Sequence, residues 1–259
     1  RLILMTYVGD NTKPQFTALV GKAVCFDSGG MNLKPTGHIE DMHLDKGGAV
    51  AVLSTIDTLA KMNAPVNVVG VIPAVENMID NQSYKPGSIL KSYDNKYVEV
   101  CNTDAEGRLI LADAMAYVQK KYELESMVDI ATLTGAICVA LGEYSAGLFS
   151  NNEEMVKSLI ESGKNVQERC WYMPIEEEHE EEIKNCRVAD IRSMGQGRDG
   201  GACTAAAFLK QFVVDNLPWA HLDIAGTGMA TKTMDWIPQG GTGFGVQLLV
   251  DWLLKKYMN

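Results

Sequence analysis

Histidine is scarce in this sequence, and the paired motifs that commonly bind zinc are absent. There is no H-E-x-x-H among the four histidines and no C-x-x-C pair among the six cysteines. A zinc site made of histidine or paired cysteine ligands is therefore not expected. The widely scattered cysteines have mostly apolar neighbours, which favours reduced core thiols of a cytoplasmic protein over disulfides.

Positive charge and long apolar runs are also lacking. The formal net charge is −10, which argues against non-specific binding to nucleic acid or to an anionic membrane. No window contains the roughly 18 consecutive apolar residues that a membrane span needs. The chain begins at Arg1 rather than at Met, and we expect it to be a fragment whose N-terminal part was removed. A targeting signal, which would lie in that part, therefore cannot be observed in this sequence.

Apolar runs of strand type alternate along the chain with segments of helical periodicity. Strands separated by helices of 10 to 20 residues are typical of α/β proteins. We predict a three-layer α/β/α sandwich around a central mixed, mostly parallel sheet, with residues 1–259 as a single domain. The predicted strands are 18–26, 66–73, 97–101, 127–133 and 221–224, and the predicted helices are 45–62, 109–122, 153–167, 176–186, 202–216 and 244–256.

Two acids, Asp104 and Glu106, follow the predicted strand 97–101 directly. Residues i and i+2 of an extended backbone point the same way, so both carboxylates are expected to face one spot. That spot lies where a strand passes into a buried helix, the usual place of ligand sites in open α/β sheets. Paired anions need a cation, and a divalent metal is the natural one. The alternative is a solvated turn carrying surface acids and Arg108.

Three further residues occupy comparable positions. Lys22 lies within a predicted strand, Asp27 ends that strand, and Asp45 begins a helix. A neutral lysine amine can bind a metal, although an interior Lys22–Asp27 pair and a helix-capping Asp45 are the simpler interpretations. Four carboxylates carry a charge of −4 and two divalent ions carry +4, which favours two metals over one.

Two other patterns carry no function in this interpretation. Residues 195–200 fit G-x-G-x-x-G and precede a predicted helix, yet they lie deep in the chain and no acid follows in the context that a dinucleotide site requires. The acidic run at 176–182 is interpreted as a solvated helix face.

The segments that carry the acids resemble a known family. The octapeptide at 102–109, Asn-Thr-Asp-Ala-Glu-Gly-Arg-Leu, is similar to the signature of the leucyl aminopeptidases, cytosolic dinuclear-zinc exopeptidases. Residues 21–30, with Lys34 following, look like the other metal-site segment of that family. Residues 131–135, 201–205 and 221–226 extend the resemblance over nearly the whole chain.

The resemblance implies five metal ligands. Asp27 and Glu106 would bridge two divalent ions, Asp104 would complete the more exchangeable site, and Lys22 with Asp45 would complete the tighter one. Zinc is the expected metal, with manganese, cobalt or magnesium as alternatives at the exchangeable site.

The resemblance also implies catalytic and substrate-binding residues. Lys34 would bind the carbonyl oxygen as it becomes a gem-diolate, and Arg108 would hold a bicarbonate that relays a proton. The pocket for the N-terminal side chain would be lined by Met42, Thr132, Gly135 and Ala225.

The function implied is that of a dinuclear metal-dependent aminopeptidase that releases leucine and other neutral N-terminal residues from peptides. The family carries an additional N-terminal domain, absent here, and assembles as a homohexamer, a dimer of trimers. Residues 1–259 would then be the catalytic domain. One alternative is a two-metal phosphoesterase, for which a basic phosphate-binding patch is missing. Another is a non-catalytic structural or DNA-binding relative, against which the acidic balance argues.

Overall fold

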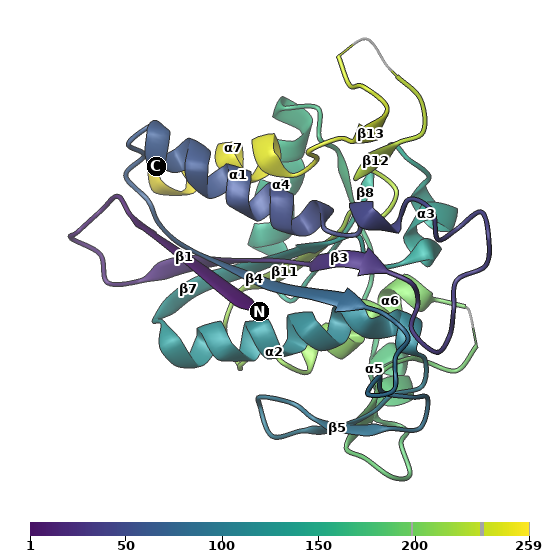
Figure 1. The fold of residues 1–259 in the computed structure, drawn as a ribbon. Helices are drawn as coiled ribbons and strands as arrows, with labels where there is room; N and C mark the ends of the chain where they lie inside the picture. The colour runs from purple at the N-terminus through teal and green to yellow at the C-terminus, as the bar shows by residue number, and fades with distance from the viewer. Residues whose placement is uncertain (198, 234–235, 259) are drawn as a thin grey trace.

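A mixed sheet of eight strands forms the centre of the computed structural model, which describes residues 1–197, 199–233 and 236–258 (Figure 1). Seven strands follow one another in the order β1-β4-β2-β7-β11-β8-β9, and β3 extends the sheet beside β4. All neighbours pair in parallel except β1 with β4 and β8 with β11. The bounds are β1 Leu2–Val8, β2 Phe16–Gly21, β3 Ala23–Asp27, β4 Asn67–Asn77, β7 Leu124–Ala131, β8 Ala146–Ser150, β9 Cys170–Tyr172 and β11 Trp219–Asp223.

Helices cover both faces of this sheet. In Figure 1, α1 (Gly47–Lys61), α4 (Glu153–Asn165) and α7 (Val246–Met258) lie above it. Below it lie α2 (Glu106–Lys121), α5 (Glu177–Lys184) and α6 (Gly201–Lys210), while α3 (Gly135–Leu141) packs near β8 and α6. The three-layer α/β/α arrangement around a mostly parallel sheet agrees with the fold class predicted from the sequence.

The alternating direction of the side chains along the buried strands explains how one sheet packs against two helical layers. Successive side chains of a strand point to opposite faces. On β2, Leu19 belongs to the apolar cluster under α1, α4 and α7, whereas Ala18 and Val20 belong to the cluster over α2 and α6. Continuous apolar strands are therefore what a doubly covered sheet requires.

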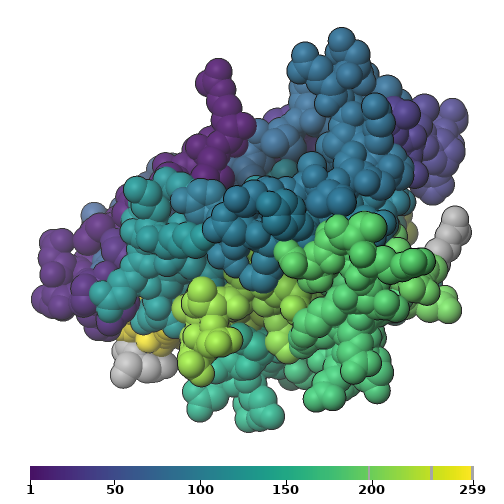
Figure 2. All heavy atoms as spheres, turned by 90° about the horizontal axis from the view of Figure 1, so that it is seen from below, coloured from purple at the N-terminus to yellow at the C-terminus, as the bar shows by residue number. Residues whose placement is uncertain are grey.

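A second, smaller sheet lies below the main one and consists of β5 (Ile89–Lys91), β6 (Tyr97–Glu99) and β10 (Ile191–Arg192). Seen from below, the blue segment that contains β5 and β6 and the green segment that contains α5 form much of this face (Figure 2). The strand predicted at 97–101 therefore exists in shortened form, but it belongs to this small sheet rather than to the central one. A further pair, β12 (Met229–Ala230) with β13 (Gly240–Gly241), lies near α3.

Two predicted boundaries near Lys22 and Asp45 are wrong. The strand predicted at 18–26 is two strands interrupted at Lys22, because the backbone there pairs with Ile130 and with Ala49 on helix α1 instead of continuing a single ladder. Helix α1 begins at Gly47, and Asp45 does not cap it. The carboxylate of Asp45 is instead bound by the Lys22 side chain.

Strands β1, β8 and β9 of the central sheet and helix α3 were not predicted, and the helix predicted at 202–216 ends earlier, at Lys210. Residue 198, within the glycine-rich stretch at 195–200, lies outside the described residues, as does residue 259 at the end of the predicted domain. Among the helices that the structure describes, none combines the length and the apolar character that crossing a membrane requires.

Candidate metal centre

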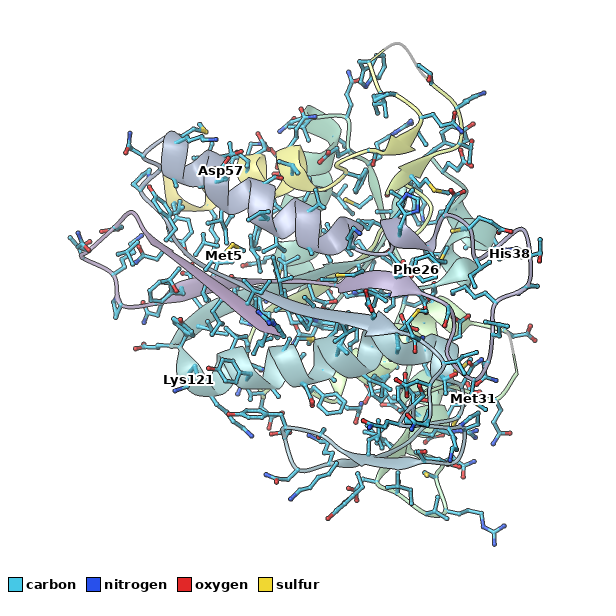
Figure 3. All side chains as sticks on the ribbon, in the orientation of Figure 1. Met5, Phe26, Met31, His38, Asp57 and Lys121 are labelled. Carbon is cyan, nitrogen blue, oxygen red and sulfur yellow. The ribbon has the colours of Figure 1, made fainter. Side chains whose placement is uncertain are left out.

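The predicted site residues gather at the carboxyl ends of the parallel strands. Asp27 is the last residue of β3, and Lys22 directly follows β2. Figure 3 labels Phe26 near the end of β3, with Met31 and His38 on the loop beyond it. The first residues of α2 lie on this same side, whereas Lys121 marks the opposite end of that helix.

The buried Lys22 side chain joins two of the acids. Its Nζ lies 2.9 and 2.8 Å from the two carboxylate oxygens of Asp45 and 3.0 Å from Glu106 Oε1. It also donates to the backbone carbonyl oxygen of Thr132 at 3.0 Å. The Thr132 hydroxyl donates to Asp45 Oδ1 at 2.6 Å, so this part of the cluster is held from three segments of the chain.

Lys34 joins the other two acids in the same way. Its Nζ lies 2.9 Å from Asp27 Oδ2 and 2.5 Å from Asp104 Oδ1. The side chains of Lys34 and Asp104 are 15% and 32% exposed, whereas that of Asp27 is only 3% exposed. The Lys34–Asp104 side is therefore the part of the cluster that a ligand from solution can reach.

The structure corrects the predicted backbone around Asp104 and Glu106. Asp104 lies in a short 3-10 helix, Thr103–Ala105, and Glu106 is the first residue of α2, so neither is extended. The side chain of Asn102 accepts a hydrogen bond from the Asp104 backbone N–H at 2.8 Å, which fixes the start of this turn. The two acids are still brought together through Asp27, because Lys34 contacts both Asp104 and Asp27, and oxygens of Asp27 and Glu106 lie within 4.8 Å of each other.

Two polar residues that the sequence analysis missed support the cluster. The Thr103 hydroxyl donates to the carbonyl oxygen of Gly29 at 2.6 Å, which ties the loop after β3 to the turn before α2. The side-chain amide of Asn77, the last residue of β4, donates to Asp27 Oδ1 at 2.8 Å. A polar residue at the carboxyl end of a buried parallel strand was the available signal for Asn77.

The electrostatics of the cluster follow from burial and from crowding of like charges. Burial raises the pKa of Glu106 and of Asp45, and neighbouring acids oppose their ionisation further. Burial also raises the pKa of Asp104, to about 6, against the influence of Lys34. Burial works to raise the pKa of Asp27 as well, but Lys34, Lys22 and the Asn77 hydrogen bond together outweigh it and lower the pKa. Four carboxylates thus share one site at a considerable electrostatic cost.

The donor set fits divalent cations. One carboxylate oxygen from each of three buried acids, Asp27, Asp45 and Glu106, lies within 4.8 Å of the others. The four acids carry two negative charges more than their ion partners Lys22 and Lys34 neutralise. Carboxylate oxygens with a nearby amine nitrogen suit zinc, manganese or magnesium.

Arg108 lies beside the acids on α2 and is only 6% exposed. Its Nη1 donates to the backbone oxygen of Ser193 at 2.8 Å, and its Nε has no hydrogen-bond partner among the described residues. Burial lowers the pKa of this guanidinium to about 10, although Glu106 and Asp223 work in the opposite direction. A buried cation with a spare donor is suited to hold a small anion.

The residues predicted to line a substrate pocket come from two neighbouring strand ends and one turn. Asp223, at the end of β11, accepts hydrogen bonds from the backbone N–H groups of Leu133, Thr134 and Ala225 and from the Thr134 hydroxyl. It thereby joins the segment with Thr132 and Gly135 to Ala225. Met42 begins the short 3-10 helix Met42–Leu44, and its carbonyl oxygen accepts from the Asp45 N–H at 3.4 Å.

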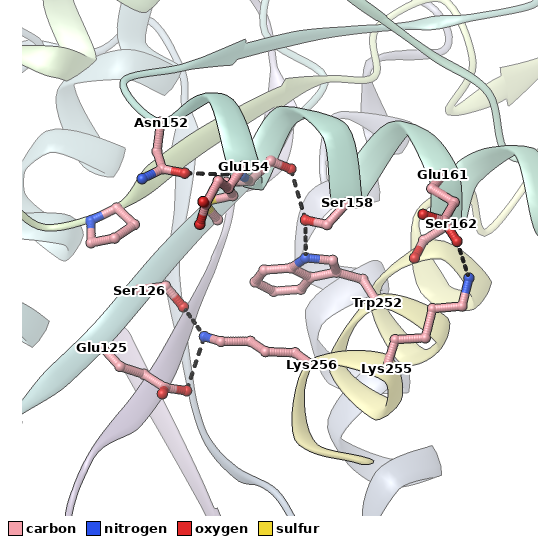
Figure 4. A pocket seen from close by; sticks show the side chains of 12 residues that line it. Glu125, Ser126, Asn152, Glu154, Ser158, Glu161, Ser162, Trp252, Lys255 and Lys256 are labelled. Atoms are coloured by element: carbon pink, nitrogen blue, oxygen red, sulfur yellow. Dashed lines mark hydrogen bonds and ion pairs between the residues drawn. The ribbon is translucent and has the colours of Figure 1, made fainter. Parts of the chain in front are cut away.

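A separate cavity of about 400 Å³ lies between α4, α7 and β7 and shares no lining residue with the cluster (Figure 4). Several of its polar groups bind one another. Lys256 contacts Glu125 and Ser126, and the indole N–H of Trp252 donates to Ser158 at 3.0 Å. We assign this cavity no part in the chemistry of the carboxylate cluster.

An α/β fold with lysines and carboxylates at the carboxyl ends of its parallel strands defines a protein with a candidate metal centre. Residues 1–250 match the model of the cytosol aminopeptidase family, catalytic domain. The chain belongs to this family.

Proteins of similar sequence support this family membership. A probable cytosol aminopeptidase of Protochlamydia amoebophila is 46% identical over 257 residues, which are 99% of this chain and 51% of that protein. The cytosol aminopeptidase of Rickettsia prowazekii is 45% identical over 258 residues, again 99% of this chain and 51% of the relative. The chain thus spans about half the length of the curated relatives it matches.

Solved structures share the fold. The bottromycin maturation enzyme BotP superposes with a TM-score of 0.92 at 32% identity, covering 100% of this chain and 55% of that one. A structure described as BotP in complex with Mn gives a TM-score of 0.92 at 33% identity, with coverage of 98% and 56%.

Proposed function

We propose that this chain is the catalytic domain of a dinuclear metal-dependent aminopeptidase. The observation that carries the proposal is the buried acid cluster, in which oxygens of Asp27, Asp45 and Glu106 lie within 4.8 Å of one another in a chain of the cytosol aminopeptidase family. The four carboxylates, with a charge of −4, support two divalent ions, for which the Lys22 ammonium would have to lose its proton. The manganese named for the BotP structure supports manganese beside zinc, with cobalt or magnesium as alternatives at the exchangeable site.

Five residues would hold the metals. Asp27 and Glu106 would bridge both ions, Lys22 and Asp45 would complete the tighter site, and Asp104 the exchangeable one. The greater exposure of Asp104 and the burial of Lys22 and Asp45 support this division. Bound metals would activate a water molecule and polarise the scissile carbonyl.

Two cations of the chain would act on the substrate. The Lys34 ammonium, at the exposed side of the cluster, supplies positive charge where the carbonyl oxygen becomes negative. The spare Nε–H of Arg108 would hold a small anion such as bicarbonate, which would supply an acceptor for the proton of the attacking water. Neither side chain needs to coordinate a metal for these roles.

The substrate would be a peptide with a free α-amine and a neutral N-terminal residue such as leucine. Met42, Thr132, Gly135 and Ala225 would border its side chain, and the hydrogen bonds of Asp223 join two of the three segments that carry these residues. Family membership supports a homohexamer, a dimer of trimers, and a cytoplasmic location for the intact protein.

The test compares leucine amide with N-acetyl-leucine amide, using the intact protein loaded with Mn²⁺ or Zn²⁺. We expect hydrolysis of leucine amide alone, because acetylation removes the amine lone pair that would bind a metal. Rates are measured by amide release, and a chelator-treated sample reloaded with metal serves as control. Equal rates on both compounds, or full activity in a verified metal-free sample, would contradict the proposal.

A further inference from the structure

One side-chain amide contacts both acids that are assigned to bridge the metals. Asn77 Nδ2 donates to Asp27 Oδ1 at 2.8 Å and to the backbone oxygen of Thr103 at 3.0 Å, and it lies 3.4 Å from Glu106 Oε2. Asn77 is only 6% exposed. Its amide thus connects the ends of β3 and β4 with the turn and helix that carry Asp104 and Glu106.

The chemistry of these neighbours fixes which way the amide faces. Both carboxylates and the Thr103 carbonyl only accept hydrogen bonds, so the NH₂ group of Asn77, and not its oxygen, must face them. The backbone is fixed as well. Asn77 is the register partner of Asp27 in the parallel ladder, and its carbonyl oxygen accepts from the N–H and the hydroxyl of Ser28 at 2.9 and 2.7 Å.

The contacts also distinguish the two oxygens of each acid. Asp27 Oδ1 accepts from Asn77 and from the Gly29 N–H at 2.9 Å, whereas Oδ2 faces the Lys34 ammonium. Glu106 directs Oε2 to Asn77 and Oε1 to the Lys22 ammonium at 3.0 Å. In both acids, one oxygen is turned to the amide and the other to a cation.

We propose that Asn77 is a positioning residue of the metal centre, which holds Asp27 and Glu106 by one oxygen each and keeps their remaining oxygens directed at the cations. The inference rests on the proposed function, because it assumes that these two acids bind metal. Groups that orient metal ligands in this way commonly contribute 10-fold to 100-fold to metal affinity or activity.

The same strand provides a matched control. Asn67, the first residue of β4, is equally buried, and its Nδ2 donates to the backbone oxygens of Asp10 and Lys13 at 2.8 and 2.9 Å. Asn67→Ala therefore removes a comparable set of hydrogen bonds from the other end of the strand. The Asn67→Ala variant shows how much of any effect on metal affinity arises simply from the loss of buried hydrogen bonds.

The experiment measures Mn²⁺ affinity by competition with a chromophoric chelator, and the melting temperature of chelator-stripped protein, for the intact wild type, Asn77→Ala and Asn67→Ala. We expect Asn77→Ala to weaken Mn²⁺ binding about 10-fold to 100-fold. Asn67→Ala should lower the melting temperature while leaving Mn²⁺ affinity within about 2-fold of wild type. At saturating Mn²⁺, Asn77→Ala should lower kcat on leucine amide with little change in KM.

Wild-type Mn²⁺ affinity in Asn77→Ala, with a loss of melting temperature like that of Asn67→Ala, would show that the amide is merely structural. Asn77→Ser, which keeps a shorter donor, should recover part of the affinity, and a Ser variant no better than Ala would count against the proposal. Should wild type bind Mn²⁺ but leave leucine amide intact, the proposed function fails while the affinity comparison still decides the role of Asn77.

Discussion

Space around Lys22 depends on one residue that has no side chain. A Cβ at Gly107 would lie 2.5 Å from Lys22 Cε and 2.8 Å from its Nζ. Lysine is usually flexible enough to move aside, but here its ammonium is held by Asp45, Glu106 and the Thr132 carbonyl. The glycine in the octapeptide is therefore needed for the ion pairs of the cluster to form.

Gly107→Ala should destabilise the protein by about 1 to 3 kcal/mol through overpacking, even though alanine favours a helix by about 1 kcal/mol over glycine. The measurement is the free energy of unfolding in urea, in the wild type and in a Lys22→Ala background. Without the lysine, the same substitution should be neutral or stabilising. An equal loss of unfolding free energy in both backgrounds would show that the added methyl group clashes with a residue other than Lys22.

At the level of elements, a buried polar pair joins two adjacent strands of the central sheet. His221 of β11 is the register partner of Asp129 of β7, and its Nδ1 lies 2.6 Å from Asp129 Oδ1. The other oxygen of Asp129 accepts from the Trp219 indole N–H at 2.7 Å. Burial lowers the pKa of His221, but Asp129 and Asp223 more than offset burial and the nearby Arg108, so the net pKa is raised.

The raised pKa gives the sign of a pH effect on stability. A histidine whose pKa is higher in the folded state contributes fully below its unfolded pKa of about 6.5, and this contribution disappears as the pH rises through the folded value. The difference in unfolding free energy between wild type and His221→Gln should therefore be largest below about pH 6.5 and should shrink at higher pH.

Urea unfolding of both proteins over a pH series checks this expectation. His38→Gln, at an exposed position, is the control and should show no such trend. A wild-type to His221→Gln difference that stayed constant, or grew as the pH rose, would contradict the charged pairing of His221 with Asp129.

The elements differ in how well the sequence predicts them. Helix α2 and the buried strands β4, β7 and β11 were found because apolar periodicity is strong there. β1 and β8, each of which pairs antiparallel with one neighbour, were missed, because short apolar stretches do not reveal their partners. The break at Lys22 was missed since it arises from pairing with β7 and α1, which are far away in sequence.

The site was predictable where a motif encodes it and not where the fold alone creates it. The octapeptide and the segment around Asp27 identified the acids that the structure brings together. Asn77 and Thr103 were not predicted as site residues. The pairing of β3 with β4 brings Asn77 to those acids, and the turn before α2 brings Thr103 there, and neither contact is encoded in a local motif. Asp45 lies with these acids, and the alternative that it caps a helix is wrong, because Lys46 stands at the N-cap of α1 while Asp45 contacts Lys22.

At the scale of the whole molecule, the excess negative charge of the cluster connects metal binding to folding. The residue that follows β2, strand β3, helix α2 and the segment before α1 all contribute charged groups, and the unfolded chain separates them. A ligand that binds only the folded state stabilises it by about 2.7 kcal/mol at 100 times its Kd. For a chain of this size, that corresponds to a rise of about 5 to 10 °C in Tm.

We therefore expect the Tm of chelator-stripped protein to rise steadily with the logarithm of added Mn²⁺ or Zn²⁺ once the metal exceeds its Kd. Asp27→Asn keeps the shape of the side chain but removes the charge of an acid assigned to both metals, so most of this dependence should be lost. Differential scanning calorimetry of both proteins across a metal series, with sodium chloride at matched ionic strength as control, measures the effect. If the wild-type Tm did not change with metal concentration, or if the Tm of Asp27→Asn rose as steeply as that of the wild type, the acid cluster would not be the metal-binding site.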